Sequence, residues 1–246
     1  MILNQTSRFA VPFFFIIAGY FWGAKVRNKS CLVSASLSMA KRLLILFIAW
    51  CFIYSTPFNI SSVYEYGFLG PIKESYWSLV EHPFILLMQG TKVHLWFLMA
   101  MIWALAISSL FIYIKQIKLA FVLSVALYLV GMLAKSYVDT PIGIHLDFNT
   151  RWGPFFSTLP FITGYILSGK VINKCWAFMG LFLFIMGLSL HFFEIYLLWK
   201  IFAAAPSVHE YVIGTYFMGV GVAMIALSNH PRLKSQLLSK TGQLSL

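Results

Sequence analysis

Acidic residues are scarce in this chain. It has seven Asp and Glu residues against eighteen Lys and Arg, and charged residues make up only 10% of its 246 positions, whereas 60% are hydrophobic. A soluble domain is usually about a quarter charged. The composition therefore argues against a soluble protein and predicts an all-α, polytopic membrane protein, with one membrane-embedded domain over residues 1–246.

The basic excess needs an explanation other than nucleic acid. A formal net charge of +11 would suggest a nucleic-acid partner for a soluble protein. Here the basic residues lie in short segments between apolar runs, where they set the orientation of membrane helices. We therefore expect the lipid bilayer as a partner, and no nucleic acid.

Several signatures of chemistry are also missing. Cys31, Cys51 and Cys175 fit neither a metal-ligand spacing nor a disulfide framework, so we expect small buried side chains and no metal site. The chain has no phosphate-binding glycine loop, no HExxH and no GxSxG. No complete set of nucleophile, base and acid can be read from it.

About seven membrane spans are expected from the apolar runs, and some are shorter than the roughly 20 residues of a full crossing. The region Phe192–Pro206 is apolar but carries Glu194 and Lys200, so we predict a surface or re-entrant helix there, with an eighth span as the alternative. The seven predicted spans are Phe9–Ala24, Arg42–Pro57, His94–Ile114, Leu119–Lys135, Pro154–Gly169, Cys175–His191 and Tyr211–Ser228.

The charges separate between alternate loops. One set of loops holds twelve basic residues and no acid, and the other holds six basic residues and all seven acids. The positive-inside rule places the first set in the cytoplasm. The outer segments are then Met1–Ser7, residues 60–93 and Ser136–Gly153.

Four ionisable side chains fall at the outer ends of the predicted spans: Arg8, His94, Arg151 and Glu194. Each of them alone can be explained as a side chain that anchors its helix at the membrane interface. An arginine beside hydrocarbon, for example, must extend its charged end to the interface or pair with another group. Four at one membrane depth favour a polar cavity, with a solvated rim as the alternative. Within the first span, Gly19 predicts a close helix approach.

Four segments resemble the membrane-bound acyltransferase-3 family, which includes bacterial O-acyltransferases of surface polysaccharides and lipid-linked sugars. Ser7–Phe21 is similar to its SRFAVPFFFxxSGYF segment, with Ala18 where serine is usual. Val93–Leu98 resembles its HLWFL segment. Leu159–Tyr165 resembles a later LPFFLLGY block of the family. Leu238–Leu246 resembles the start of its C-terminal GxxSLGIYLxH block.

The resemblance implies transfer of an acyl group, chiefly acetyl, from cytoplasmic acyl-CoA to a hydroxyl of a surface glycan or lipid-linked sugar, in the bacterial inner membrane. The family's signature is a basic residue and a histidine, taken as the catalytic base, on its first transmembrane helix. We find no such helix here, nor the family's last one, and interpret the chain as a fragment. An exposed apolar groove is then expected beside Phe9–Trp22.

Candidate roles follow from this resemblance and from the positions of the residues. Arg8 and His94 are candidates for stabilising charge and orienting substrate during catalysis. The phosphates of coenzyme A are assigned to Lys41 and Arg42, near Lys25 and Arg27, with a purely topological role as the alternative. The candidates for lining the substrate site are Tyr20, Trp96, Arg151 and Glu194.

A transporter or flippase is the alternative function, since such proteins also place polar groups inside a helical bundle. That class favours broken helices near the bilayer midplane and paired halves. The sequence has no evident internal symmetry, and its ionisable groups gather at one interface. A structural remnant without activity is a third possibility.

Overall fold

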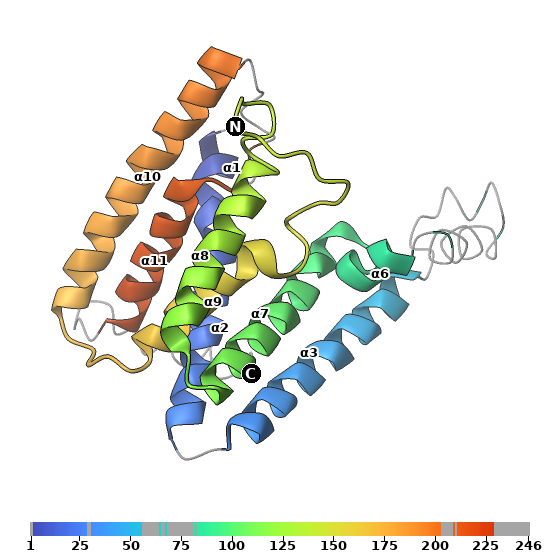
Figure 1. The fold of residues 1–246 in the computed structure, drawn as a ribbon, viewed down its shortest axis with the longest axis vertical. Coiled ribbons are helices and arrows are strands. Elements are labelled where there is room, and N and C mark those ends of the chain that lie inside the picture. Colours follow the sequence, from blue (N-terminus) through green and yellow to red (C-terminus); the bar gives the residue numbers. More distant parts are fainter. Residues whose placement is uncertain are drawn as a thin grey trace.

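The computed structural model describes residues 2–28, 31–55, 64, 67, 81, 83–202, 209 and 211–228. Within these residues every regular element is a helix, which confirms the all-α bundle (Figure 1). The helices in chain order are α1 (Ile2–Thr6), η1 (Ser7–Phe9), α2 (Ala10–Arg27), α3 (Leu32–Ser55), α6 (Pro83–Gln89), η2 (Val93–Leu95), α7 (Trp96–Tyr113), α8 (Ile117–Leu133), α9 (Pro154–Leu167), α10 (Cys175–Phe202) and α11 (Ile213–Leu227).

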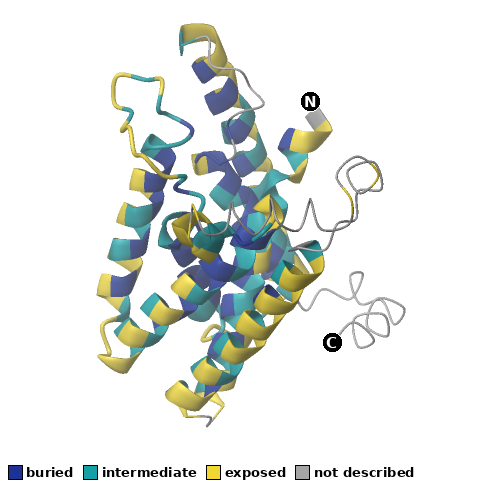
Figure 2. Cartoon of the chain, turned by 90° about the vertical axis from the view of Figure 1, so that its right-hand side faces the viewer, coloured by how far each residue is buried: buried dark blue, intermediate teal, exposed yellow. Residues whose placement is uncertain are grey.

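Within the part of the chain that the structure describes, four helical stretches are long and apolar enough to cross a membrane, namely Leu3–Arg27, Leu32–Tyr54, Val93–Tyr113 and Cys175–Phe202. The other apolar helices, α8, α9 and α11, are shorter. Large apolar side chains are exposed on the outside of the bundle, for example Phe52 at 75% and Phe178 at 68%. Figure 2 shows this exposure along the outer faces, with buried residues between the helices. Such a surface suits lipid, and the chain is an integral membrane protein.

The prediction of a separate surface helix after His191 is wrong for the described residues. Helix α10 continues without interruption to Phe202, so Phe192–Phe202 belongs to the sixth predicted span. Its two charged residues do not end the helix, because Glu194 is buried in the bundle and the ammonium of Lys200 lies 5.1 Å from the ring of Trp199. The remaining residues of that prediction, 203–206, lie outside the described ones.

Helix α3 begins ten residues before the predicted start at Arg42. Lys41 and Arg42 therefore lie on a helix, exposed on its surface, and not in a loop. Both residue types have good helix propensity, and an exposed position imposes no desolvation cost on either. Cys31 and Cys175 are also exposed, so the expectation that the cysteines are buried is wrong for these two.

Most of the predicted outer loop 60–93 lies outside the described residues. Its described part includes the short helix α6, which packs against α7, and the 3₁₀ turn η2, which leads into α7. The predicted loop Ser136–Gly153 is described throughout, and it connects α8 to α9 without regular structure beyond turns. These two segments lie beside each other at one end of the bundle (Figure 1).

Helix α9 occupies the centre of the bundle and is buried from Phe156 to Gly164. It crosses α2 so closely that a Cβ atom on Gly164 would collide with the carbonyl oxygen of Ile16. A Cβ atom on Gly19 would collide in turn with the carbonyl of Phe161. The predicted close approach at Gly19 is confirmed, and it fixes how α2 is placed over α9.

The links between α2 and α3, α7 and α8, and α9 and α10 lie at one end of the bundle, which we call the inner end (Figure 1). The predicted cytoplasmic basic residues of these links gather there. Arg27 donates from Nε to Ser168 Oγ at 3.2 Å and from its terminal nitrogen to the carbonyl of Tyr165 at 3.3 Å. A cation at the carboxyl end of α9 stabilises that helix, so Arg27 has a structural role.

Candidate active site

A small cavity lies at the opposite, outer end of the bundle, and we call it the arginine cavity. Its volume is about 180 Å³, and four helices, α2, α7, α9 and α11, begin next to it. The amino end of a helix carries partial positive charge, so this arrangement favours negative charge in the cavity. The cavity is lined by Arg8, Val11, Trp96, Arg151, Phe156 and Tyr211.

Arg8 is held by the segment that precedes α2. It lies in η1, between α1 and α2, and the neighbouring Phe9 packs edge-on against Phe184 of α10 with ring centroids 5.9 Å apart. One turn earlier, Oε1 of the buried Gln5 accepts a hydrogen bond from Nε2 of His191 at 3.2 Å. Contacts on both sides of Arg8 therefore fix its position at the mouth of α2.

His191 connects this segment to α11. Its ring is fully buried, and Nδ1 lies 3.1 Å from Oγ1 of Thr215. Arg8 and the buried His209 are close enough to interact electrostatically with it. The amino-terminal segment, α10 and α11 thus meet in a buried polar cluster behind the arginine cavity.

Arg151 reaches the cavity from the turn before α9. Its backbone N–H donates to Oδ1 of Asn149 at 3.1 Å, and Oγ1 of the adjacent Thr150 donates to the carbonyl of Gly131 at 2.8 Å. Gly153 turns the chain into α9 with a φ of 73°, a conformation that favours glycine. The guanidinium of Arg151 lies 5.2 Å from the centre of the Trp96 ring, within range of a cation–π interaction.

Tyr211 forms the buried side of the cavity. Its hydroxyl lies 3.1 Å from Oγ1 of Thr150, and its ring centroid is 4.5 Å from that of Phe156. The hydroxyl of Ser136 donates to its carbonyl oxygen. Tyr211 is thereby fixed by its ring, its hydroxyl and its main chain. Its sequence position, at the start of a predicted span, gives no signal beyond that of an interfacial aromatic residue.

The cavity can bind part of an anionic or polarised group. Two guanidinium side chains, each with a fork of N–H donors, face a space of about 180 Å³. Sites for whole drug-sized ligands are typically about 300–1,000 Å³, so this space fits an acyl head but not an entire coenzyme A. Donors placed in advance around such a volume are suited to stabilising an oxyanion.

Glu194 lies outside the arginine cavity and has a structural position. Its carboxylate accepts hydrogen bonds from the hydroxyl of Tyr137 at 2.6 Å and from the backbone N–H groups of Ile213 and Gly214 at 3.2 and 2.9 Å. It therefore satisfies the first amide groups of α11, which have no partners within that helix. Burial, followed by the hydrogen bond to Glu194, raises the pKa of the Tyr137 hydroxyl, which keeps it a donor.

We expect Glu194→Gln to destabilise the protein by about 1–3 kcal/mol. The NH₂ group of the new amide would face one of the three groups that donate to the Glu194 carboxylate. One of the donors at the start of α11, next to Tyr211, would then lose its acceptor. The measurement is thermal unfolding in lipid nanodiscs. Tyr137→Phe, which removes only one of the three bonds, should lower the melting temperature less. Equal melting temperatures for Glu194→Gln and wild type would contradict the capping role.

The other candidates do not line the arginine cavity. His94 is exposed and packs edge-on against Tyr54, with ring centroids 4.9 Å apart. Tyr20 lies on α2 three turns further into the bundle, about 18 Å along the helix from Arg8. Lys41 and Arg42 lie on α3, outside the cavity lining. The structure therefore brings together Arg8, Trp96 and Arg151, and not the remaining candidates.

Among the described residues, no three His, Cys, Asp or Glu side chains are grouped so that they could hold a metal ion. The groups at the arginine cavity are instead cationic, aromatic and phenolic. These groups bind and orient anionic or polarised atoms.

Comparisons with known proteins agree with the resemblance of the sequence motifs. A family model described as an acyltransferase domain matches residues 1–246. Neither the search of curated proteins nor that of solved structures found a match. The match extends over the whole chain, including every residue that lines the arginine cavity. This chain belongs to the acyltransferase-3 family and is a membrane-bound acyltransferase.

Proposed function

We propose that this acyltransferase moves an acetyl group from acyl-CoA on the cytoplasmic side to a hydroxyl of a surface glycan or lipid-linked sugar, in the bacterial plasma membrane. The observation that carries the proposal is the pair Arg8 and Arg151 on one small cavity at the end of the bundle that the positive-inside rule places outside. The family supplies the reaction class.

In this reaction the acceptor oxygen attacks the thioester carbonyl carbon, and the carbon–sulfur bond breaks. The acceptor proton leaves through a general base and ends on the coenzyme A sulfur, so the products are an ester and a free thiol. The negative charge that develops on the carbonyl oxygen would lie between the guanidinium groups of Arg8 and Arg151. The family resemblance assigns the role of the base to a histidine on the family's first transmembrane helix.

The aromatic side chains supply the remaining surface of the site. The Trp96 ring holds the Arg151 guanidinium at 5.2 Å, and Phe156 and Tyr211 close the cavity from the bundle interior. We propose that His94, two residues before Trp96, contacts substrate outside the cavity. Lys41 and Arg42 are exposed cations on α3, and we propose that they bind the coenzyme A phosphates. Tyr20 and Glu194 then have structural roles outside the arginine cavity.

The proposal is tested with purified protein in proteoliposomes, using acetyl-CoA labelled in the acetyl group on one side and a lipid-linked oligosaccharide as acceptor. We expect labelled ester on the acceptor and a matching loss of donor. Movement of the oligosaccharide across the bilayer without donor consumption would instead favour a flippase, the alternative class.

A further inference from the structure

A second, larger pocket opens beside the arginine cavity, and we call it the outer pocket. It has a volume of about 570 Å³ and lies between α6, the end of α8 and the loop that leads to α9. Arg151 lines the arginine cavity, while the next residue, Trp152, lines the outer pocket. One turn of the chain thus separates the two spaces. The volume of the outer pocket is in the range of sites that bind small ligands.

The polar groups of the outer pocket suit hydroxyl groups. Asp139 and Asp147 are exposed at its wall, and neither is hydrogen-bonded or ion-paired to another described residue. Carboxylates only accept hydrogen bonds, so their partners must be donors. Lys135 supplies donors in the same pocket. The amide of Asn149 uses its oxygen to hold Arg151, which leaves its NH₂ group as a donor. A ligand with several hydroxyls can donate to the carboxylates and accept from the other two groups.

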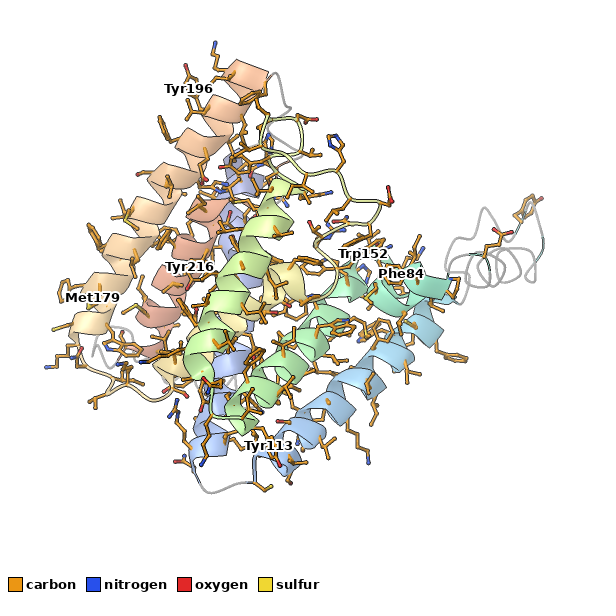
Figure 3. The ribbon with its side chains drawn as sticks, viewed as in Figure 1. Phe84, Tyr113, Trp152, Met179, Tyr196 and Tyr216 are labelled. Atoms are coloured by element: carbon orange, nitrogen blue, oxygen red, sulfur yellow. The ribbon has the colours of Figure 1, made fainter. Side chains whose placement is uncertain are left out.

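The apolar part of the outer pocket is aromatic. The indole N–H of Trp152 donates to Oε1 of Gln89 at 3.1 Å, which fixes the ring between the α9 turn and α6. Phe84 of α6 is 52% exposed and Phe148 of the loop is 37% exposed, and both line the pocket. Trp152 and Phe84 lie close together at this end of the bundle (Figure 3). The electron-rich face of an aromatic ring attracts the polarised C–H groups on the face of a sugar ring.

We propose that the outer pocket binds a neutral sugar residue of the acceptor and presents one of its hydroxyls to the arginine cavity. This rests on the proposed function, because it names the part of the acceptor that is recognised. The pocket carries two carboxylates against one ammonium, so it disfavours acidic sugars such as uronic acids. The arginine cavity remains the place for the acyl group and its developing charge.

The test measures sugar binding without any acyl donor. Wild-type protein in lipid nanodiscs, free of sugar-based detergents, is studied by saturation-transfer difference NMR with methyl α-glucopyranoside, methyl N-acetylglucosaminide and methyl glucuronide. We expect signals from the neutral glycosides and a much weaker one from the glucuronide at neutral pH. Asp147→Asn and Trp152→Leu should lower the affinity for the neutral glycosides about ten-fold. Glu81→Gln, an exposed carboxylate that lines no described pocket, is the matched control and should bind like wild type.

The outcomes separate this proposal from the proposed function. No binding of any neutral glycoside by wild type, or full binding by both pocket variants, would overturn the sugar site. Asp147→Asn is nearly isosteric, so its loss of binding with an unchanged melting temperature cannot be attributed to unfolding. Acyl transfer with an unchanged acceptor KM in both variants would overturn the pocket and leave the function standing. Selective sugar binding without acyl transfer would support the sugar site and contradict the proposed function.

Discussion

Arg8→Ala is expected to lower kcat/KM for acyl transfer about 10²–10³-fold while the protein stays folded. The side chain lines the arginine cavity with Arg151, and removing it leaves the developing oxyanion with half of its cationic donors. The folded state should survive because the neighbours Phe9 and Gln5 keep their contacts to Phe184 and His191. The measurement is the initial rate of labelled ester formation by purified variants of equal melting temperature.

Matched variants make the role of Arg8 specific. Arg8→Lys keeps the charge but loses the planar fork, so its rate should lie between those of alanine and wild type. Arg151→Ala should cause a comparable loss. Lys118→Ala removes an exposed cation at the inner end of the bundle and should leave the rate unchanged. Near-normal turnover in both Arg8→Ala and Arg151→Ala would rule out the arginine cavity as the site of transfer.

Gly164→Ala is expected to have the largest effect on stability, about 3 kcal/mol or more. The added Cβ atom would collide with the Ile16 carbonyl oxygen and lie 2.7 Å from the Tyr20 nitrogen, and neither backbone atom can rotate away. The crossing of α2 over α9 would have to open, which would displace both Arg8 and Phe156. The measurement is the yield of monodisperse protein and its melting temperature in nanodiscs.

Gly23→Ala is the control for this prediction, since it lies on α2 and faces the same helix. Its Cβ atom would meet the side chains of Ser168 and Tyr165, which can shift, and not a backbone atom. We expect a smaller loss of stability for Gly23→Ala than for Gly164→Ala. If Gly164→Ala were as stable as wild type, the close backbone approach of α2 and α9 would be disproved.

Much of the fold could be predicted from the spacing of apolar runs and basic loops. The predicted starts of the spans at Pro154 and Cys175 coincide with α9 and α10, because a proline and a preceding polar loop mark those helix starts. The predictions failed where a charge interrupts an apolar run. Glu194 was expected to end a span, but the partners that let it stay inside α10 come from the distant residues Tyr137 and Gly214.

The candidate site could be predicted only in part. Arg8 and Arg151 were identifiable because a cation at the end of an apolar helix is rare and costly. Trp96 was identifiable because it lies within the segment that resembles the family's HLWFL motif. Tyr211 gave no such signal, since its importance comes from contacts with Phe156 and Thr150, which are 55 and 61 residues away in sequence. Pairings of this kind depend on how helices pack, and a single sequence does not reveal them.

The exposed apolar groove expected beside Phe9–Trp22 stays a prediction, but α2 does expose large apolar side chains on one side. Phe14 is 55% exposed and Phe21 is 62% exposed, and these residues are seven apart, so they lie on one side of the helix. The opposite side packs against α9 and α11. In a membrane this side of α2 contacts lipid or another helix, and it begins at Phe14, six residues after Arg8.

The stoichiometry of transfer is the most direct measurement of what this chain does. Purified protein is given acetyl-CoA and a sugar acceptor, and the free coenzyme A thiol and the new ester are counted in the same sample. We expect one ester for each thiol released. The double variant Arg8→Ala/Arg151→Ala should produce neither the ester nor the free thiol. Thiol release without ester, or ester formation that persists in that double variant, would contradict acyl transfer at the arginine cavity.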